Sequence, residues 1–215
     1  MWGSGNIETR EYDLSGFTAV KASRFKVEIV QSETYSVTVR ADDNIIDRLV
    51  VRKSGDTLHL QKKPTFWTIG HITLEATIGM PSLTAIELSG AASARIPEFP
   101  GIGRLDIEAN GAAAIKGRLM AERIDVLLSG ASRLRLAGSA ERVTVEASGA
   151  SRLDLSELTA ATGRVELSGA SRATMRFTDS IESVEASGAS RLRYLGDPAL
   201  GHVESSGASR IARVA

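Results

Sequence analysis

Five arginines recur at nearly constant spacing in the C-terminal half of the chain, and their type and pattern point to a specific chemistry. They are Arg133, Arg152, Arg172, Arg191 and Arg210, separated by steps of 19, 20, 19 and 19 residues. If successive repeats stack as neighbouring strands, the guanidinium groups form a row with a spacing of about 4.8 Å. Guanidinium binds carboxylate and phosphate through paired hydrogen bonds. The row is therefore a candidate site for an anionic polymer, such as an acidic polysaccharide or the phosphates of a lipopolysaccharide.

A second row of charged residues gives another explanation for these arginines. Glutamates recur three residues before the repeat glycine, with Leu127 replacing one of them: Glu87, Glu108, Glu146, Glu166, Glu185 and Glu204. Stacked like charges repel each other unless something neutralises them. A nearly matched acid row could do so and form a surface ion-pair lattice. We regard this lattice as the more ordinary interpretation, and the sequence leaves both open.

An aromatic pair, Phe66 and Trp67, is the other candidate contact site. It lies in residues 61–71, a segment that Pro64 and Gly70 set apart from the strand-like stretches around it. An exposed aromatic pair on a loop could contact a sugar or a protein partner. Since large apolar groups are normally covered, we favour the interpretation that the pair fills the junction between two coils.

The remaining residues give no recognisable catalytic, cofactor or metal motif. The chain has no cysteine, and its three histidines lie far apart, without metal-ligand spacing: His59, His71 and His202. A carbohydrate-active enzyme would need clustered carboxylates in a groove, whereas the aspartates are scattered over different rows and the turns between repeats, such as residues 137–140, look short. We expect no catalytic residue, cofactor or metal, and keep a carbohydrate-active enzyme as an alternative.

A repeat of about 19 to 20 residues must position the arginines. Its glycines, each within a Ser-Gly-Ala motif or a close variant, are Gly90, Gly111, Gly130, Gly149, Gly169, Gly188 and Gly207. On both sides of the glycine, apolar residues alternate with polar ones, which is the period of a strand with one buried face. One repeat cannot bury this face alone, but stacked repeats can.

These features predict an all-β protein, a single right-handed parallel β-helix. We expect one domain over residues 1–215, with irregular N-terminal coils in 1–80, regular coils in 81–215, and nine or ten coils in all. Glycine at a coil corner supplies a positive φ or room for close backbone approach. The serine two residues after it in the full copies is predicted to point inward, in a ladder in which each hydroxyl group bonds to its neighbour or to the backbone near the bend.

Composition limits the partners. The net charge is zero, with 26 basic and 26 acidic residues, so nothing points to nucleic acid. No apolar stretch approaches the length of a membrane span, and the first residues do not look like a signal peptide. The last coil, ending near Ile211, would expose strand edges and an apolar cross-section, so self-association through the C-terminal coil is a further hypothesis.

The chain also resembles a known bacterial family, the putative auto-transporter adhesin head GIN domain family (DUF2807). The resemblance covers nearly the whole chain and depends on the repeated Ser-Gly-Ala-Ser motif together with residues 3–6, 17–20, 37–44, 55–58, 80–83 and 86–91. It implies a right-handed β-helix of the cell envelope, usually exported behind a signal sequence, and it implies no catalytic residue.

We therefore expect a non-enzymatic module of the cell envelope or cell surface that functions in adhesion or in binding a glycan or another partner. Its location would be periplasmic, outer-membrane-associated or secreted, with the signal peptide removed. A purely structural oligomerising module is an alternative besides the enzyme.

Overall fold

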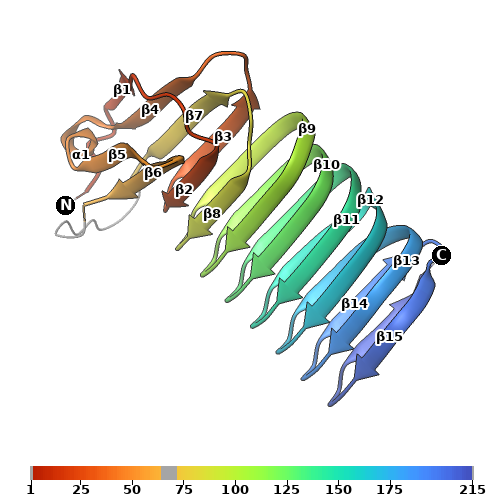
Figure 1. Cartoon of the computed structure of the whole chain (residues 1–215). Coiled ribbons are helices and arrows are strands. Elements are labelled where there is room, and N and C mark those ends of the chain that lie inside the picture. Colours follow the sequence, from red (N-terminus) through yellow and green to blue (C-terminus); the bar gives the residue numbers. More distant parts are fainter. Residues whose placement is uncertain (1, 64–71, 215) are drawn as a thin grey trace.

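The structure is a computed structural model that describes residues 2–63 and 72–214. Apart from one short helix, its regular elements are strands (Figure 1). In chain order they are β1 (Ile7–Glu11), β2 (Ala19–Ser23), β3 (Lys26–Gln31), β4 (Ser36–Asp42), α1 (Asp43–Ile46), β5 (Leu49–Ser54), β6 (Thr57–Lys62), β7 (Leu74–Met80), β8 (Ala85–Ser89), β9 (Ser93–Ala109), β10 (Ala114–Leu128), β11 (Arg133–Ala147), β12 (Arg152–Leu167), β13 (Arg172–Ala186), β14 (Arg191–Leu195), β15 (Ala199–Ser205) and β16 (Arg210–Arg213).

The repeats form a right-handed β-solenoid of about seven turns, each of about 19 residues. Strands β9 to β13 are 15 to 17 residues long, and each bends back on itself so that it contributes to both sides of the solenoid (Figure 1). Each strand pairs in parallel with the equivalent strand of the next coil. The predicted all-β fold and the parallel coils are confirmed.

The solenoid has two broad faces that meet at the Ser-Gly-Ala corners. We call one the arginine face; it runs from β4 through β7 and β3 to the first halves of β9–β13, and ends with β14 and β16. We call the other the glutamate face; it runs from β5 through β6, β2 and β8 to the second halves of β9–β13, and ends with β15. The N-terminal strands therefore extend both faces of the repeat region.

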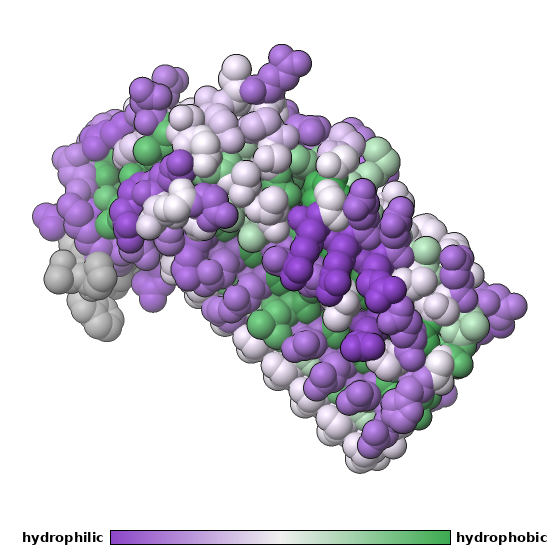
Figure 2. Space-filling model, in the orientation of Figure 1, coloured by the Kyte–Doolittle hydropathy of each residue, from purple (hydrophilic) through white to green (hydrophobic). Residues whose placement is uncertain are grey.

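The corner holds successive coils together by a regular hydrogen-bond ladder. At Gly149 the backbone has φ of +71°, and a Cβ atom there would lie 2.6 Å from the carbonyl oxygen of Gly130. This close approach lets the Ala150 N–H donate to that oxygen at 2.7 Å, and the same bond recurs from corner to corner. In Figure 2 the stacked small residues form a pale edge where the arrowheads of Figure 1 end.

The predicted inward serines are confirmed, although they do not form a chain of hydroxyl groups. Ser132, Ser151, Ser171 and Ser190 are buried. Ser151 Oγ donates to the carbonyl oxygen of Ser148 at 2.7 Å, and Ser132 and Ser171 make the equivalent bond. The hydroxyl groups therefore donate hydrogen bonds to backbone carbonyl oxygens near the bend. Among the described residues, these carbonyl groups have no hydrogen-bond partner on a neighbouring strand.

The expectation of nine or ten coils is wrong, because much of the N-terminal region is not coiled. Strand pairs β1–β4, β4–β7 and β5–β6 are antiparallel. Alternating apolar residues predict a half-buried strand but not its direction, so the sequence pattern did not separate hairpins from coils. Residues 137–140 are likewise not a turn but part of β11, which bends without interruption. One apolar cluster runs from Phe17 to Leu192.

Candidate ligand-binding groove on the arginine face

The structure brings the five predicted arginines into one straight row. Arg133 lies in register with Arg152, and Arg152 with Arg172. The row continues to Arg191 and Arg210 on β14 and β16. All five side chains are exposed. Among the described residues, none of them makes an ion pair or a side-chain hydrogen bond, so their charges are left for solvent or for a ligand.

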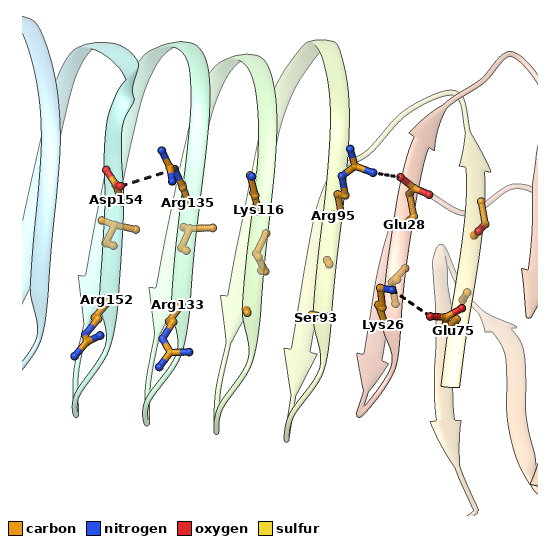
Figure 3. Close-up of a pocket in the computed structure, with 18 of the residues that line it drawn as sticks. Lys26, Glu28, Glu75, Ser93, Arg95, Lys116, Arg133, Arg135, Arg152 and Asp154 are labelled. Atoms are coloured by element: carbon orange, nitrogen blue, oxygen red, sulfur yellow. Dashed lines mark hydrogen bonds and ion pairs between the residues drawn. The ribbon is translucent and has the colours of Figure 1, made fainter. Parts of the chain in front are cut away.

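A groove of about 940 Å³ lies over this face, across the boundary between the N-terminal strands and the coils (Figure 3). Three residues of the row line it, Arg133, Arg152 and Arg172, whereas Arg191 and Arg210 lie beyond it. Eight cationic side chains line the groove: Lys26, Arg40, Arg95, Lys116, Arg133, Arg135, Arg152 and Arg172. Only three acidic side chains oppose them: Glu28, Glu75 and Asp154. The groove is therefore strongly positive although the chain as a whole is neutral.

The N-terminal wall of the groove is neutralised by ion pairs. Glu75 lies between two cations and accepts from Lys26 and from Arg40, both at 3.1 Å. Glu28 accepts from Arg95 at 2.9 Å. Figure 3 shows the pair of Lys26 with Glu75 and the pair of Arg95 with Glu28 on the side of β3 and β7. Both carboxylates are thus engaged by cations and contribute little free negative charge to the groove.

A second basic row runs parallel to the arginines, two residues further along each strand. Arg95 is in register with Lys116, and Lys116 with Arg135. Hydrogen bonding to Glu157, aided by the charges of Glu157 and Asp154, raises the pKa of the Arg135 guanidinium above its ordinary value. Lys116, between Arg95 and Arg135, has no ion pair among the described residues. This row extends the positive surface away from the corner.

The glutamate row does not neutralise the arginine row by direct pairing. It lies before the corner on the other face, and no ion pair within 4.0 Å joins the two rows in the part of the chain that the structure describes. Glu87 pairs instead with Lys21, and Glu204 with His202 at 3.7 Å. The predicted ion-pair lattice is therefore absent among the described residues, since the corner separates its two halves.

The glutamate face has its own internal compensation. Arg123 Nε donates to Asp125 Oδ2 at 2.7 Å, and Arg104 contacts the same oxygen at 3.2 Å. Partial burial of Asp125 by itself raises its pKa, but side-chain hydrogen bonds from Arg123 and Thr144, together with the charges of both arginines, outweigh burial, so the pKa is below its usual range. A hollow of about 450 Å³ on this face is lined by both acids and bases.

The other residues singled out in the sequence do not form a site. Phe66 and Trp67 lie outside the described residues, so their role stays a prediction. His59 is half-buried in β6, and its pKa is lowered by burial and then by the charges of Arg52 and Lys21. Within residues 2–63 and 72–214, no group of three or more His, Asp or Glu side chains is placed to hold a metal ion.

The sequence pattern predicted three of the eight cationic side chains that line the groove and missed the other five. Arg95, Lys116 and Arg135 could have been found, because each follows a repeat glycine by five residues and so shares a face with the arginine row. Lys26 and Arg40 gave no such signal. They reach the groove only because β3 pairs with β9, and β7 joins β3 to β4.

The groove brings two carboxylates close together, as a carbohydrate-active enzyme would need, but both are held by cations. Glu28 and Glu75 lie on adjacent strands in diagonal positions, a separation of about 7–8 Å between backbones. Glycosidases need one carboxylic acid that donates a proton and one free carboxylate. Here each carboxylate is held by a cation, which favours a structural role for both.

Together, the stacked coils and the basic groove define a right-handed β-solenoid with a cationic groove on one face. A family model described as "Putative auto-transporter adhesin, head GIN domain" matches residues 16–198. The chain therefore belongs to this family, as its resemblance implied. No curated protein matches the chain.

Solved structures agree with this fold over the full length of the chain. A putative adhesin from Bacteroides fragilis is 21% identical, with a TM-score of 0.91 and 100% of both chains covered. A putative adhesin from Parabacteroides distasonis is 14% identical, with a TM-score of 0.79 and 99% of each chain covered. A putative lipid binding protein from the same species is 17% identical, with a TM-score of 0.75, covering 100% of this chain and 99% of that one. At these identities the likeness shows the fold, and with the family it supports an adhesin-like surface module.

Proposed function

We propose that this protein is a non-enzymatic adhesin-like module that binds an acidic polysaccharide along the groove of the arginine face. The observation that carries the proposal is the excess of eight cations over three acids in a 940 Å³ groove. Arg133, Arg152 and Arg172 line it without an ion pair among the described residues. Row spacing supports a polymer over a small ligand, because cations recur at about 4.8 Å along the solenoid.

A linear polyuronate fits this pattern chemically. It carries one carboxylate on every sugar residue, so a chain that lies along the row offers it several anions. An arginine that meets one of these carboxylates can form paired hydrogen bonds with it. Two small side chains also line the groove, Ser156 and Thr174; they leave room for sugar rings, and Thr174 offers a hydroxyl group.

The test is salt-dependent retention of the protein on immobilised polygalacturonate, with neutral dextran as the blank. We expect retention on polygalacturonate alone, weakening as salt screens the charges. Replacing Arg133, Arg152 and Arg172 together by serine should weaken binding by about tenfold or more, because three charge-assisted contacts disappear at once.

The glutamate face offers a matched control. Arg104, Arg123 and Arg142 are also stacked in register, so their replacement by serine removes the same charge from a row of the same geometry. These arginines already have acidic partners. The control variant should keep its retention. Equal elution of the groove variant and wild type, or equal loss in both variants, would contradict the proposal.

The same experiment separates binding from catalysis. After prolonged incubation with the protein, the chain length of polygalacturonate should be unchanged. Shortening of the polymer that is lost in a Glu28→Gln, Glu75→Gln variant would favour the carbohydrate-active enzyme instead.

An envelope or extracellular location suits this function, because acidic polysaccharides are found there. The family description supports it. The described residues contain no helix that is long and apolar enough to cross a membrane. We propose that the module lies in the periplasm, at the outer membrane or outside the cell. Detection of the protein only in a cytoplasmic fraction of its native host would contradict this placement.

The final coil favours a second candidate function, self-association. Leu200 and Val203 on β15 are 46% and 44% exposed, whereas their register partners on β13, Ile181 and Val184, are buried. A second copy of the chain could cover the exposed apolar end of the last coil, because the coils of both copies have the same cross-section. Light scattering across a concentration series should show a dimer that Val203→Glu abolishes. A monomer at every concentration would exclude it.

A further inference from the structure

The arginine row is interrupted at one place, and the interruption creates a depression in the groove. Between Lys26 on β3 and Arg133 on β11, the row holds only Ser93 and Ala114. Two adjacent strands thus lack a long side chain. The backbones of Lys26 and Arg133 are three strand spacings apart, about 14 Å. Figure 3 shows the open floor beside Ser93, with Lys26 and Arg133 on its two sides.

Cations surround this depression on its remaining side as well. Arg95 follows Ser93 by two residues on the same face, and Lys116 follows Ala114 in the same way. Figure 3 shows both side chains on the side of the floor away from the corner. The depression is therefore bounded by four cations: Lys26, Arg95, Lys116 and Arg133.

These four cations are not equally available. Lys26 is engaged by Glu75, and Arg95 by Glu28. Lys116 and Arg133 make no ion pair among the described residues, and they lie diagonally across strands β10 and β11. Like charges on neighbouring strands destabilise each other, so this pair favours a bound anion. Because Lys26 and Arg95 already have acidic partners, the cations left for an anion in this depression are Lys116 and Arg133, close to Ser93.

The donors near this space suit a particular kind of anion. A lysine ammonium group acts as a point charge with three donors, a guanidinium offers a planar fork, and the half-buried Ser93 offers a hydroxyl. In Figure 3 the Lys116 side chain points away from the corner and the Arg133 side chain points towards it, so both must turn towards Ser93 to contact one anion. A tetrahedral group with three free oxygens can accept from all three donors, whereas a planar carboxylate has only two oxygens and suits one guanidinium fork.

We propose that this depression is a discrete subsite for one sulfate or phosphate half-ester, held by Lys116, Arg133 and the Ser93 hydroxyl. The inference rests on the proposed function in that the subsite would anchor one end of a glycan lying along the arginine row. The glycan proposed here carries a sulfate or phosphate group that a plain polyuronate lacks. Ligands with such a group at one end should bind more tightly than ligands carrying carboxylates alone.

Small probes test the subsite separately from the polymer. Titration calorimetry at low ionic strength should show binding of glucose 6-phosphate and glucose 6-sulfate, and binding of glucuronate at least about tenfold weaker, because fewer charge-assisted bonds form. Inorganic phosphate serves as a further probe. Binding of inorganic phosphate as tight as that of the sugar phosphate would assign the site to the free ion instead of a glycan substituent and overturn the glycan part of the proposal.

Two variants change the subsite in different ways. Lys116→Gln removes the central charge, and Ala114→Leu fills the depression without changing any charge. Each should weaken glucose 6-phosphate binding about tenfold, consistent with the loss of one charge-assisted contact or of the space. Lys53 is an exposed lysine on β5, so Lys53→Gln is the matched control for charge and should bind as wild type does. Wild-type affinity in both subsite variants, or equal affinity for glucuronate and glucose 6-phosphate, would overturn the proposal.

Retention on polygalacturonate distinguishes the two proposals. Lys116→Gln should keep most of its retention, because the arginine row is intact. If wild type binds glucose 6-phosphate but not polygalacturonate, the subsite stands and the polymer proposal fails. If it binds polygalacturonate but no sugar phosphate or sulfate, the subsite proposal fails and the polymer proposal stands.

Discussion

The N-terminal strands and the repeat coils build the same arginine face, but they place charges on it differently. Across β4, β7 and β3 an acid lies between two bases, in the order Arg40, Glu75 and Lys26. Across β11, β12, β13, β14 and β16 the same row is arginine in every strand. Strands without a repeat can set unlike residues side by side, whereas a residue that recurs in every repeat is stacked on copies of itself. This row therefore presents unpaired charge in the coils and paired charge in the N-terminal strands.

This comparison explains where the groove is positive. Its N-terminal wall is closed by ion pairs, and its remaining cations belong to the coils. Exposed ion pairs contribute little to stability, so leaving arginines unpaired costs the fold little. The repeat can thus maintain a charged row for binding while the corners and the apolar core provide stability.

The largest expected effect separates the stacked corner from an unstacked turn. Gly149→Ala should lower the free energy of unfolding by about 4 kcal/mol, since a positive φ and a forced backbone contact both add strain. Gly55 in the N-terminal region has φ of +62° but nothing within 4 Å of a Cβ, so Gly55→Ala should cost only about 1–2 kcal/mol. Urea unfolding of both variants measures the difference. Equal losses would show that corner stacking contributes no additional strain.

A smaller effect tests charge pairing within the coils on the glutamate face. The folded-state pKa of Asp125 is below its usual range, so its ion pair stabilises the fold above about pH 4 and that contribution is lost as the pH falls further. Asp125→Asn should cost about 1 kcal/mol at neutral pH and show a shallower loss of stability below about pH 4. Thermal unfolding across pH measures this. Parallel curves for the variant and wild type would mean that the pair contributes nothing.

Glu75→Gln should make the N-terminal wall of the groove resemble the coils. It releases Lys26 and Arg40 from their shared partner. Because the pairs are exposed, stability should change by less than about 1 kcal/mol. Retention on polygalacturonate should rise, with a steeper dependence on salt. Unchanged retention would limit the ligand to the coil side of the groove.

The reverse substitution should make the coils resemble the N-terminal wall. Arg172→Glu places an acid between Arg152 and Arg191, its register partners. Opposite charges on neighbouring strands should add about 0.2–1 kcal/mol to the free energy of unfolding, while retention on polygalacturonate falls. Unfolding and retention measured on one preparation test both. A loss of stability would contradict the view that the unpaired row is unfavourable for the fold.

Several features were predictable from the sequence because they depend on the repeat alone. The glycine period, the inward Ser151 and the outward Arg152 follow from strand alternation around a corner, and the structure confirms them. The arginine row follows from the same regularity. Strand direction in residues 7–62 was not predictable, because hairpins and coils share one apolar alternation.

The coil, its corner and the row of arginines follow from the sequence, since each is local or repeats every 19 to 20 residues. The residues that lie beside that row depend on the packing of distant strands. The pairing of β3 with β9 brings Glu28 to Arg95 across 67 residues of chain and sets Lys26 beside Ser93. The corner turns the glutamate row onto the other face. These arrangements depend on which distant strands pack over the core, and that choice leaves no periodic signal in the chain.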